Sequence, residues 1–261
     1  MRKKFGSACI NNKTYVIASD GDLMEAISHE SMSLAGHLKL KNLIVFFDKN
    51  KISIDGSTSL SVSDNYKKRF ESYGWNFLEI DGHNEKQIST SITKASKSNK
   101  PTLISCKTII GFGSPNKSGK ASSHGSPLGD EEIKLVRKKL KWNNKPFEIP
   151  QEVLDEWRKI GNKGQLLEEK WQEAINKKNS KIKSDLEKNY LNSDLENLES
   201  LIDKEKTKYF ESKPSLATRQ CSMATIESIS ALLPQLIGGS ADLSGSNNTK
   251  TNNSKIINSK N

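Results

Sequence analysis

Two polar segments of the chain carry oxygen atoms of the kind that bind a divalent cation. Asp20 follows the apolar run Tyr15–Ala18, and Asn50 follows a second apolar run at residues 43–47. A hard cation such as Mg²⁺ takes oxygen ligands, commonly one or two from protein side chains and the rest from phosphates and water. Asp20 could supply a carboxylate and Asn50 an amide oxygen. An exposed main-chain carbonyl such as that of Ile52 could complete a three-ligand face.

Gly21 adds a feature that suits a diphosphate group. A residue without a Cβ lets the backbone approach an anion closely, and the N-terminus of a following helix favours negative charge. The competing interpretation is that Asp20 and Gly21 form a turn and that Asn50 is a loop residue, because these residue types favour turns. Spacing alone does not decide between a metal–phosphate site and two turns.

The four histidines differ in their surroundings along the chain. His29 and His37 fall within a predicted helix and His83 in a turn, where packing or surface roles are the ordinary interpretation. His124 lies in the polar loop 122–129 and could bring a titratable imidazole into a cleft.

Three charged residues could have functional roles, but each could also be an ordinary charge on a helix. Arg219 is one of five arginines among the 41 basic residues, and its planar fork suits bidentate binding of a phosphate. It could equally be a surface charge at a helix start. Glu25 and Glu30 lie on the first predicted helix and, taken singly, resemble ordinary helix carboxylates.

Alternating strands and helices would position these residues. Strand, helix and strand between residues 14 and 56 predict one parallel βαβ unit, because parallel neighbours need a crossover helix. Further strands are expected at Trp75–Ile80 and Thr102–Lys107. The helices of this part are expected at Leu23–Leu38, Asp64–Tyr73 and Glu85–Ser98. This order predicts an α/β fold with a doubly wound, mostly parallel sheet, in which ligands bind beyond the carboxyl ends of the strands.

The rest of the chain changes character after the last predicted strand. Ile109–Gly129 is a long glycine-rich loop, and long ordered loops usually have a function. The remaining predictions are helices at Asp130–Leu140, Glu152 to about Asn189, Leu191–Phe210 and Leu216–Leu233, and a short strand at Leu236–Leu243. We therefore expect a first domain at 1–150, a helical extension and linker at 151–212, and the beginning of a second α/β domain at 213–261.

Composition excludes several classes of protein. With 33% hydrophobic and 28% charged residues, no stretch approaches the roughly 20 apolar residues of a membrane span, and no signal peptide is evident. The net charge of +10 comes mainly from lysines spread among acidic residues, which favours a solvated surface over nucleic-acid binding. Three widely separated cysteines indicate reduced thiols in a cytoplasmic protein.

Five segments, in the same order, resemble transketolases. The first two, which resemble the thiamine diphosphate fingerprint shared among thiamine-dependent enzymes, are SDGDLMEAISHE (19–30) and DKNKISIDG (48–56). The other three are more specific to transketolase: KTIIGFGSPNK (107–117), SHGSPLG (123–129) and GGSADL (238–243). The resemblance covers nearly the whole chain and is weakest between residues 152 and 210.

The resemblance implies a cofactor site at the two strand ends. By position, Asp20, Asn50 and the carbonyl of Ile52 would bind Mg²⁺, for which Ca²⁺ or Mn²⁺ could substitute. Gly21 and Asn50 would contact the diphosphate. Ile54 would pack on the cofactor rings.

The resemblance also implies residues for the substrate and for assembly. His124 would lie near both the cofactor phosphates and the reacting hydroxyls of the substrate. Arg219 and Ser246 would bind the phosphate of a sugar phosphate, and Asp242 would be a cofactor-binding acid of the second, pyrimidine-side domain. By position, the carboxylates expected at the subunit interface of a homodimer are Glu25 and Glu30.

The implied reaction is transfer of a two-carbon ketol unit from a ketose phosphate to an aldose phosphate, as in the pentose phosphate pathway. Two positions depart from the family: Ser19 and Ala26 stand where glycine is usual, and both could loosen the site. We expect the chain to be an internal segment of a longer enzyme and to be inactive, or nearly so, alone. The rival interpretations are another thiamine enzyme acting on sugar phosphates, such as deoxyxylulose-phosphate or dihydroxyacetone synthase, and a non-catalytic relic.

Overall fold

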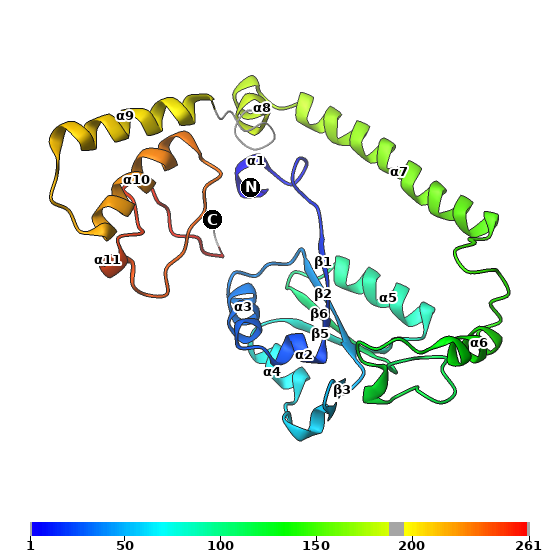
Figure 1. Ribbon diagram of the computed structural model, residues 1–261. Helices are drawn as coiled ribbons and strands as arrows, with labels where there is room; N and C mark the ends of the chain where they lie inside the picture. The colour runs from blue at the N-terminus through cyan, green and yellow to red at the C-terminus, as the bar shows by residue number, and fades with distance from the viewer. Residues whose placement is uncertain (1, 188–195, 260–261) are drawn as a thin grey trace. The chain divides into compact units, whose positions relative to one another are not determined.

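The computed structural model describes residues 2–187 and 196–259 (Figure 1). Its contacts divide the chain into two compact units. One combines residues 11–162 with 258–261 and contains the sheet. The other combines residues 1–10 with 163–257 and is helical.

The sheet unit contains four parallel strands in the order β1-β2-β6-β5. The strands are β1 (Thr14–Ser19), β2 (Leu43–Lys49), β5 (Asn76–Asp81) and β6 (Thr102–Lys107). Continuous apolar sequence in β2 and β6 explains their central place, because strands of a parallel sheet are covered on both faces. The α/β fold with a parallel sheet is therefore confirmed, and β6 has the bounds predicted from the sequence.

Side chains that alternate along the strands build two cores. One face packs Val45, Phe47 and Leu103 against apolar residues from α2 (Asp20–Met24), α3 (Ala26–His37) and α4 (Tyr66–Ser72). The other face packs Ile44, Ile104 and Cys106 against Ala95 of α5 (Glu85–Ser96). Figure 1 shows these helices on opposite sides of the sheet.

The expected single helix at Leu23–Leu38 is two helices. Glu25 separates α2 from α3 with an extended backbone (φ −67°, ψ 141°). The break is physically reasonable because α2 begins immediately at the strand end, at Asp20, and the chain must change direction to lay α3 on the sheet. Asp20 and Gly21, for which a turn was the competing interpretation, accordingly form the first turn of a helix.

One glycine fixes the contact between α3 and the turn after α4. A Cβ built on Gly36 would lie 1.8 Å from the main-chain oxygen of Tyr73. No side chain fits such a distance, so the two backbones approach as closely as they do only because residue 36 is glycine.

Short elements follow the strand ends. β3 (Ile52–Ser53) and β4 (Gly56–Ser57) form an antiparallel hairpin that leads into the 3₁₀ turn η1 (Thr58–Leu60). The loop after β6 contains η2 (Ala121–Ser123) and ends at α6 (Asp130–Lys139).

The helical unit has its own small core of Phe5, Cys9, Ile175 and Leu186. Its elements are α1 (Arg2–Phe5), the later part of α7 (Gln151–Asn176), α8 (Ser180–Leu186), α9 (Glu196–Ser212), α10 (Thr218–Leu232) and α11 (Ser244–Asn247). The run expected to be helical to about Asn189 ends at Asn176 and restarts where Asn179 caps α8 by accepting the N–H of Ile182 (2.9 Å). Residues 188–195 of the two predicted helices lie outside the described part.

The strand predicted at Leu236–Leu243 is wrong. These residues form bends and irregular backbone, and Leu236 and Ile237 are 49% and 76% exposed. An apolar run becomes a strand only when a neighbouring strand accepts its main-chain hydrogen bonds, and no strand of the described residues pairs with it.

Among the described residues, every helix is either too short or too polar to cross a membrane.

Candidate functional site

The ends of β1 and β2 bring Asp20 to the segment that follows Lys49. Ser19 pairs with Asp48 in the parallel register, so the two strands end side by side. Asp20 is 2% exposed, and its Oδ2 accepts the main-chain N–H of Lys51 (2.8 Å). The predicted proximity of residues 20 and 50 is thus present in the structure, although their roles as ligands stay predictions.

The segment around Lys51 is held in a turned conformation. Asn50 Oδ1 accepts the N–H of Ile52 (2.9 Å), and the Lys51 carbonyl accepts the N–H of Thr58 (3.1 Å). Lys51 itself has φ of 64°, a left-handed conformation that is unfavourable for a residue with a Cβ. The hairpin beyond it exposes Ile54 to 73%, leaving an apolar side chain open at the site.

Burial raises the pKa of the Asp20 carboxyl above its ordinary value. The main-chain N–H groups of Lys51 and Asn50 act in the opposite direction, and the nearby Asp48 carboxylate adds to the increase. A buried carboxylate without a full positive partner is destabilised in its charged form. A cation beside Asp20 would remove that penalty.

The first turn of α2 leaves room at Gly21. Ser19 caps the helix, because its hydroxyl oxygen accepts the main-chain N–H of Asp22 (3.4 Å). In return, the main-chain N–H and the hydroxyl of Ser19 donate to Asp22 Oδ2 (2.7 and 2.8 Å). The hydroxyl of Ser19, which stands where the resemblance leads us to expect glycine, is therefore bonded to its own helix. A Cβ on Gly21 would meet only Ser19 Oγ, at 3.9 Å, so the fold itself does not require glycine there.

Arg69 supports this end of the sheet and was not identified from the sequence. Its guanidinium donates to the carbonyl of Leu23 at the end of α2 (3.2 Å) and pairs with Asp64 (2.8 Å). It also lies over the ring of Tyr66, 4.7 Å from the centroid, and contacts His29. The sequence could have drawn attention to Arg69 through the scarcity of arginine, because a rare Arg within an apolar helix pattern indicates a specific partner.

His83 also has a defined partner. Its Nε2 accepts the N–H of Ile109 (3.0 Å), and its ring stacks on Phe112 with centroids 3.9 Å apart. Both contacts are at the start of the long loop. The sequence interpretation as a surface or packing histidine did not anticipate this anchoring of the loop.

His124 is exposed at the end of η2, and its ring makes no hydrogen bond or ion pair with the described residues. Arg219, Asp242 and Ser246 are exposed residues of the helical unit. Their places relative to Asp20 stay predictions.

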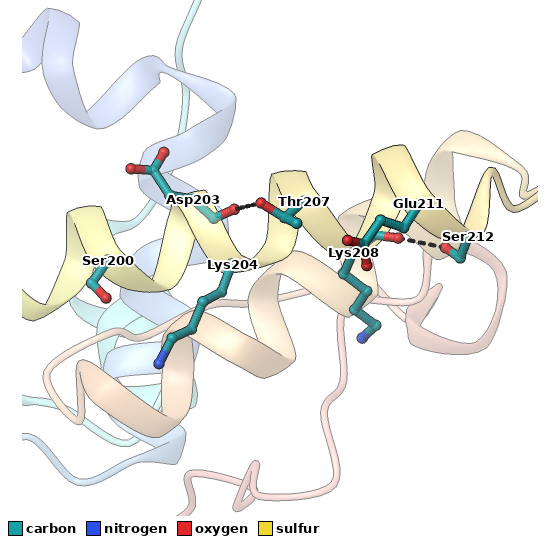
Figure 2. A pocket seen from close by; sticks show the side chains of 7 residues that line it. All are labelled: Ser200, Asp203, Lys204, Thr207, Lys208, Glu211 and Ser212. Carbon is teal, nitrogen blue, oxygen red and sulfur yellow. Dashed lines mark hydrogen bonds between the residues drawn. The ribbon is translucent and has the colours of Figure 1, made fainter.

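A cavity of about 880 Å³ opens along α9 and does not have the character of a catalytic site (Figure 2). In Figure 2, Lys204 and Lys208 extend to one side of the helix and the carboxylate of Asp203 to the other. Asp203 already pairs with Lys206 (3.2 Å), and Lys208 with Glu205 (3.8 Å). The lining is solvated helix surface.

The residues at the strand ends fit a diphosphate with a bound cation. In the described part of the chain no cluster of three or more His, Cys, Asp or Glu could hold a metal by itself. The strand ends instead offer one buried carboxylate, one amide oxygen and an open glycine beside a helix start. This donor set suits a Mg²⁺ ion that keeps phosphate oxygens and water among its ligands.

Several known proteins resemble this chain in sequence. Residues 2–196 match the family described as "Transketolase, thiamine diphosphate binding domain". A transketolase of Buchnera aphidicola (from Acyrthosiphon pisum) is 49% identical over 250 residues, covering 94% of this chain and 37% of that protein. Transketolase 2 of Escherichia coli K12 is 42% identical over 245 residues, covering 92% and 37%.

Solved structures give the same result. Transketolase from Campylobacter jejuni superposes with a TM-score of 0.79 at 36% identity, covering 97% of this chain and 38% of that one. Transketolase of Pichia stipitis, in a complex with sedoheptulose-7-phosphate, has a TM-score of 0.79 at 35% identity, covering 92% and 36%. The chain spans about 37% of the length of the curated relatives it matches.

Proposed function

The chain belongs to the transketolase family, and from that membership we propose that it contributes the diphosphate side of the cofactor site in an enzyme that transfers a two-carbon ketol unit between sugar phosphates. The buried Asp20 carboxylate beside the 50–52 segment is the observation that supports this proposal most directly. Matches to proteins named transketolase do not favour deoxyxylulose-phosphate or dihydroxyacetone synthase.

Each residue at the strand ends has a proposed task toward the cofactor. Asp20, Asn50 and the Ile52 carbonyl would hold Mg²⁺, while Gly21 lets the diphosphate reach the start of α2. Ile54, exposed in this chain, would pack against the cofactor rings. Thiamine diphosphate, when bound, supplies the electron-accepting chemistry that ketol transfer requires.

Further residues have proposed tasks toward the substrate. His124 would hydrogen-bond the hydroxyls of the sugar at the reacting carbons and move a proton there. Arg219 and Ser246 would bind the substrate phosphate, since a guanidinium and a hydroxyl both donate to phosphate oxygens. Asp242 would take part in binding the cofactor from the second domain. The division at 1–150, 151–212 and 213–261 is proposed with it, as is a cytoplasmic location.

The same proposal includes a homodimer. Glu25 and Glu30 are exposed on and beside α3, and Ile27 and Leu34 of that helix are 68% and 56% exposed. Exposed apolar residues flanked by carboxylates suit an interface between two copies of the complete enzyme.

Calorimetric titration of thiamine diphosphate into the chain tests the cofactor site. Binding is expected with Mg²⁺ and not with EDTA. Gly21→Ala should weaken Mg²⁺-dependent binding by about tenfold while leaving the unfolding transition unchanged, because its Cβ meets open space in the protein but would meet a phosphate. Equal binding by Gly21→Ala and the unmodified chain would show that the diphosphate does not contact Gly21.

A further inference from the structure

One buried carboxylate anchors the end of the loop that carries His124. Glu132, in the first turn of α6, is 7% exposed. It accepts hydrogen bonds from the hydroxyl of Ser114 and from the main-chain and side-chain N–H groups of Asn116 (both 2.9 Å). All three partners donate, and an ionised carboxylate is the side chain that only accepts. The bonds from Ser114 and Asn116 lower the pKa of Glu132 to about 2.

Ser114 extends the constraint to Lys117. Because the hydroxyl hydrogen of Ser114 is donated to Glu132, its oxygen is oriented to accept the main-chain N–H of Lys117 (3.0 Å). A neighbouring acid shows that charge at the start of α6 does not produce this arrangement by itself. Within the described residues Glu131 pairs only with Lys134 (2.6 Å), and its side chain is 86% exposed.

Lys117 holds the chain on both sides of His124. Its carbonyl accepts the hydroxyl of Ser123 (2.6 Å), and its ammonium group donates to the carbonyl of Leu128 (2.8 Å). Lys117 thus fixes Ser123, which immediately precedes the histidine, and also Leu128, which lies four positions after it. The hydrogen bonds run without interruption from Glu132 to both flanks of His124.

We propose that Glu132 is a positioning residue that sets the place of His124 through Ser114 and Lys117. Its value for catalysis rests on the proposed function, in which His124 meets the substrate. The connection itself is a property of this chain and can be measured without cofactor or substrate.

The test compares Glu132→Gln with the matched control Glu131→Gln in the intact 261-residue chain. Glutamine offers one oxygen and one NH₂ group to three donors, so the network loses an acceptor. Hydrogen exchange in Glu132→Gln should become about tenfold faster at the loop N–H groups of Lys117, Gly119, Ser123 and His124, with β6 unchanged. Glu131→Gln should exchange like the unmodified chain.

A spectroscopic readout separates positioning from general destabilisation. The ring Cε1–H signal of His124 in NMR spectra should shift or broaden in Glu132→Gln, while the ring signals of His29, His37 and His83 stay in place. Loop exchange within about twofold of the unmodified chain, together with an unmoved His124 signal, would overturn the proposal.

A second variant decides the matter even if Glu132→Gln does not fold. Lys117→Met leaves the hydrogen bonds to Glu132 intact and removes the bond to Leu128, together with a positive charge that acts on Glu132. It should move the His124 signal while the N–H of Asn116 stays protected, and an unmoved signal would refute the link through Lys117. Because no cofactor is present, failure of thiamine diphosphate binding would leave this result standing, and the reverse also holds.

Discussion

At the scale of single residues, the site combines buried charge with backbone strain. Asp20 is buried at a strand end and reached by the N–H of Lys51, which itself adopts φ of 64°. The sequence indicated the carboxylate and the amide because Asp and Asn follow two apolar runs. It could not indicate the strain, because a lysine carries no signal for a left-handed backbone.

Replacing Lys51 by glycine should stabilise the chain. A side chain in the left-handed region costs about 1–2 kcal/mol, and the extra freedom of glycine when unfolded offsets about half of that. We therefore expect the free energy of unfolding in urea to rise by about 0.5–1 kcal/mol. Lys51→Ala keeps the strain and is the control, expected to stay close to the unmodified chain. No gain for Lys51→Gly would show that the conformation is unstrained.

At the scale of elements, apolar runs, helical spacing of apolar residues, and glycine or proline at element ends predicted most of the sheet unit. The four parallel strands and helices α3, α4, α5 and α6 lie within a few residues of their expected bounds. The helix break at Glu25 was missed because its cause is the packing of α3 on the sheet. The false strand at Leu236–Leu243 has the opposite cause: its apolar run lacks a described neighbour to pair with.

Two glycine substitutions in helices should have opposite effects. Gly36→Ala forces a Cβ onto the oxygen of Tyr73 and should lower the free energy of unfolding by about 3 kcal/mol. Gly164→Ala in α7 meets open space and should raise it by about 0.5–1 kcal/mol through helix propensity. Urea denaturation measures both. A harmless Gly36→Ala would mean that α3 and the turn after α4 do not pack as described.

The anchor of the long loop should make stability depend on pH. The folded-state pKa of Glu132 is lowered from 4.5 to about 2, so its contribution is complete above the unfolded pKa and is lost as pH falls from about 4.5 to about 2. At neutral pH, Glu132→Gln should be less stable than the unmodified chain, and the difference should shrink toward zero as the pH approaches 2. Denaturation at several pH values, with Glu131→Gln as control, measures it. A difference that does not change with pH would contradict the ionised network.

At the scale of the whole molecule, the chain matches about 37% of its curated relatives' length. Five ordered motifs in the sequence were enough to predict the family. They do not tell how Arg219, Asp242 and Ser246 lie relative to Asp20, because these residues belong to a different unit and no local pattern links the two.

We predict that the isolated chain, supplied with thiamine diphosphate, Mg²⁺ and pentose phosphates, performs no measurable ketol transfer. Ile54 and His124 are exposed, so water would reach a cofactor and substrate bound there, and catalysis by electrostatic preorganisation needs water excluded. A coupled assay of sugar-phosphate products measures the activity. Sustained turnover would contradict the prediction.

We propose that Asp20 and Asn50 share one cation with a diphosphate, and Mn²⁺ used in place of Mg²⁺ makes binding of that cation measurable. In electron paramagnetic resonance spectra, the free Mn²⁺ signal should fall when chain and thiamine diphosphate are both present. Asp20→Asn keeps an acceptor for the N–H of Lys51 but removes the charge. It should weaken Mn²⁺ binding by about 100-fold, because loss of a residue that only supports a metal ligand already lowers metal affinity by about 10- to 100-fold. The exposed Asp55, changed to Asn, is the control and should bind as before. Unchanged Mn²⁺ binding in both Asp20→Asn and Asn50→Ala would show that neither residue binds the cation.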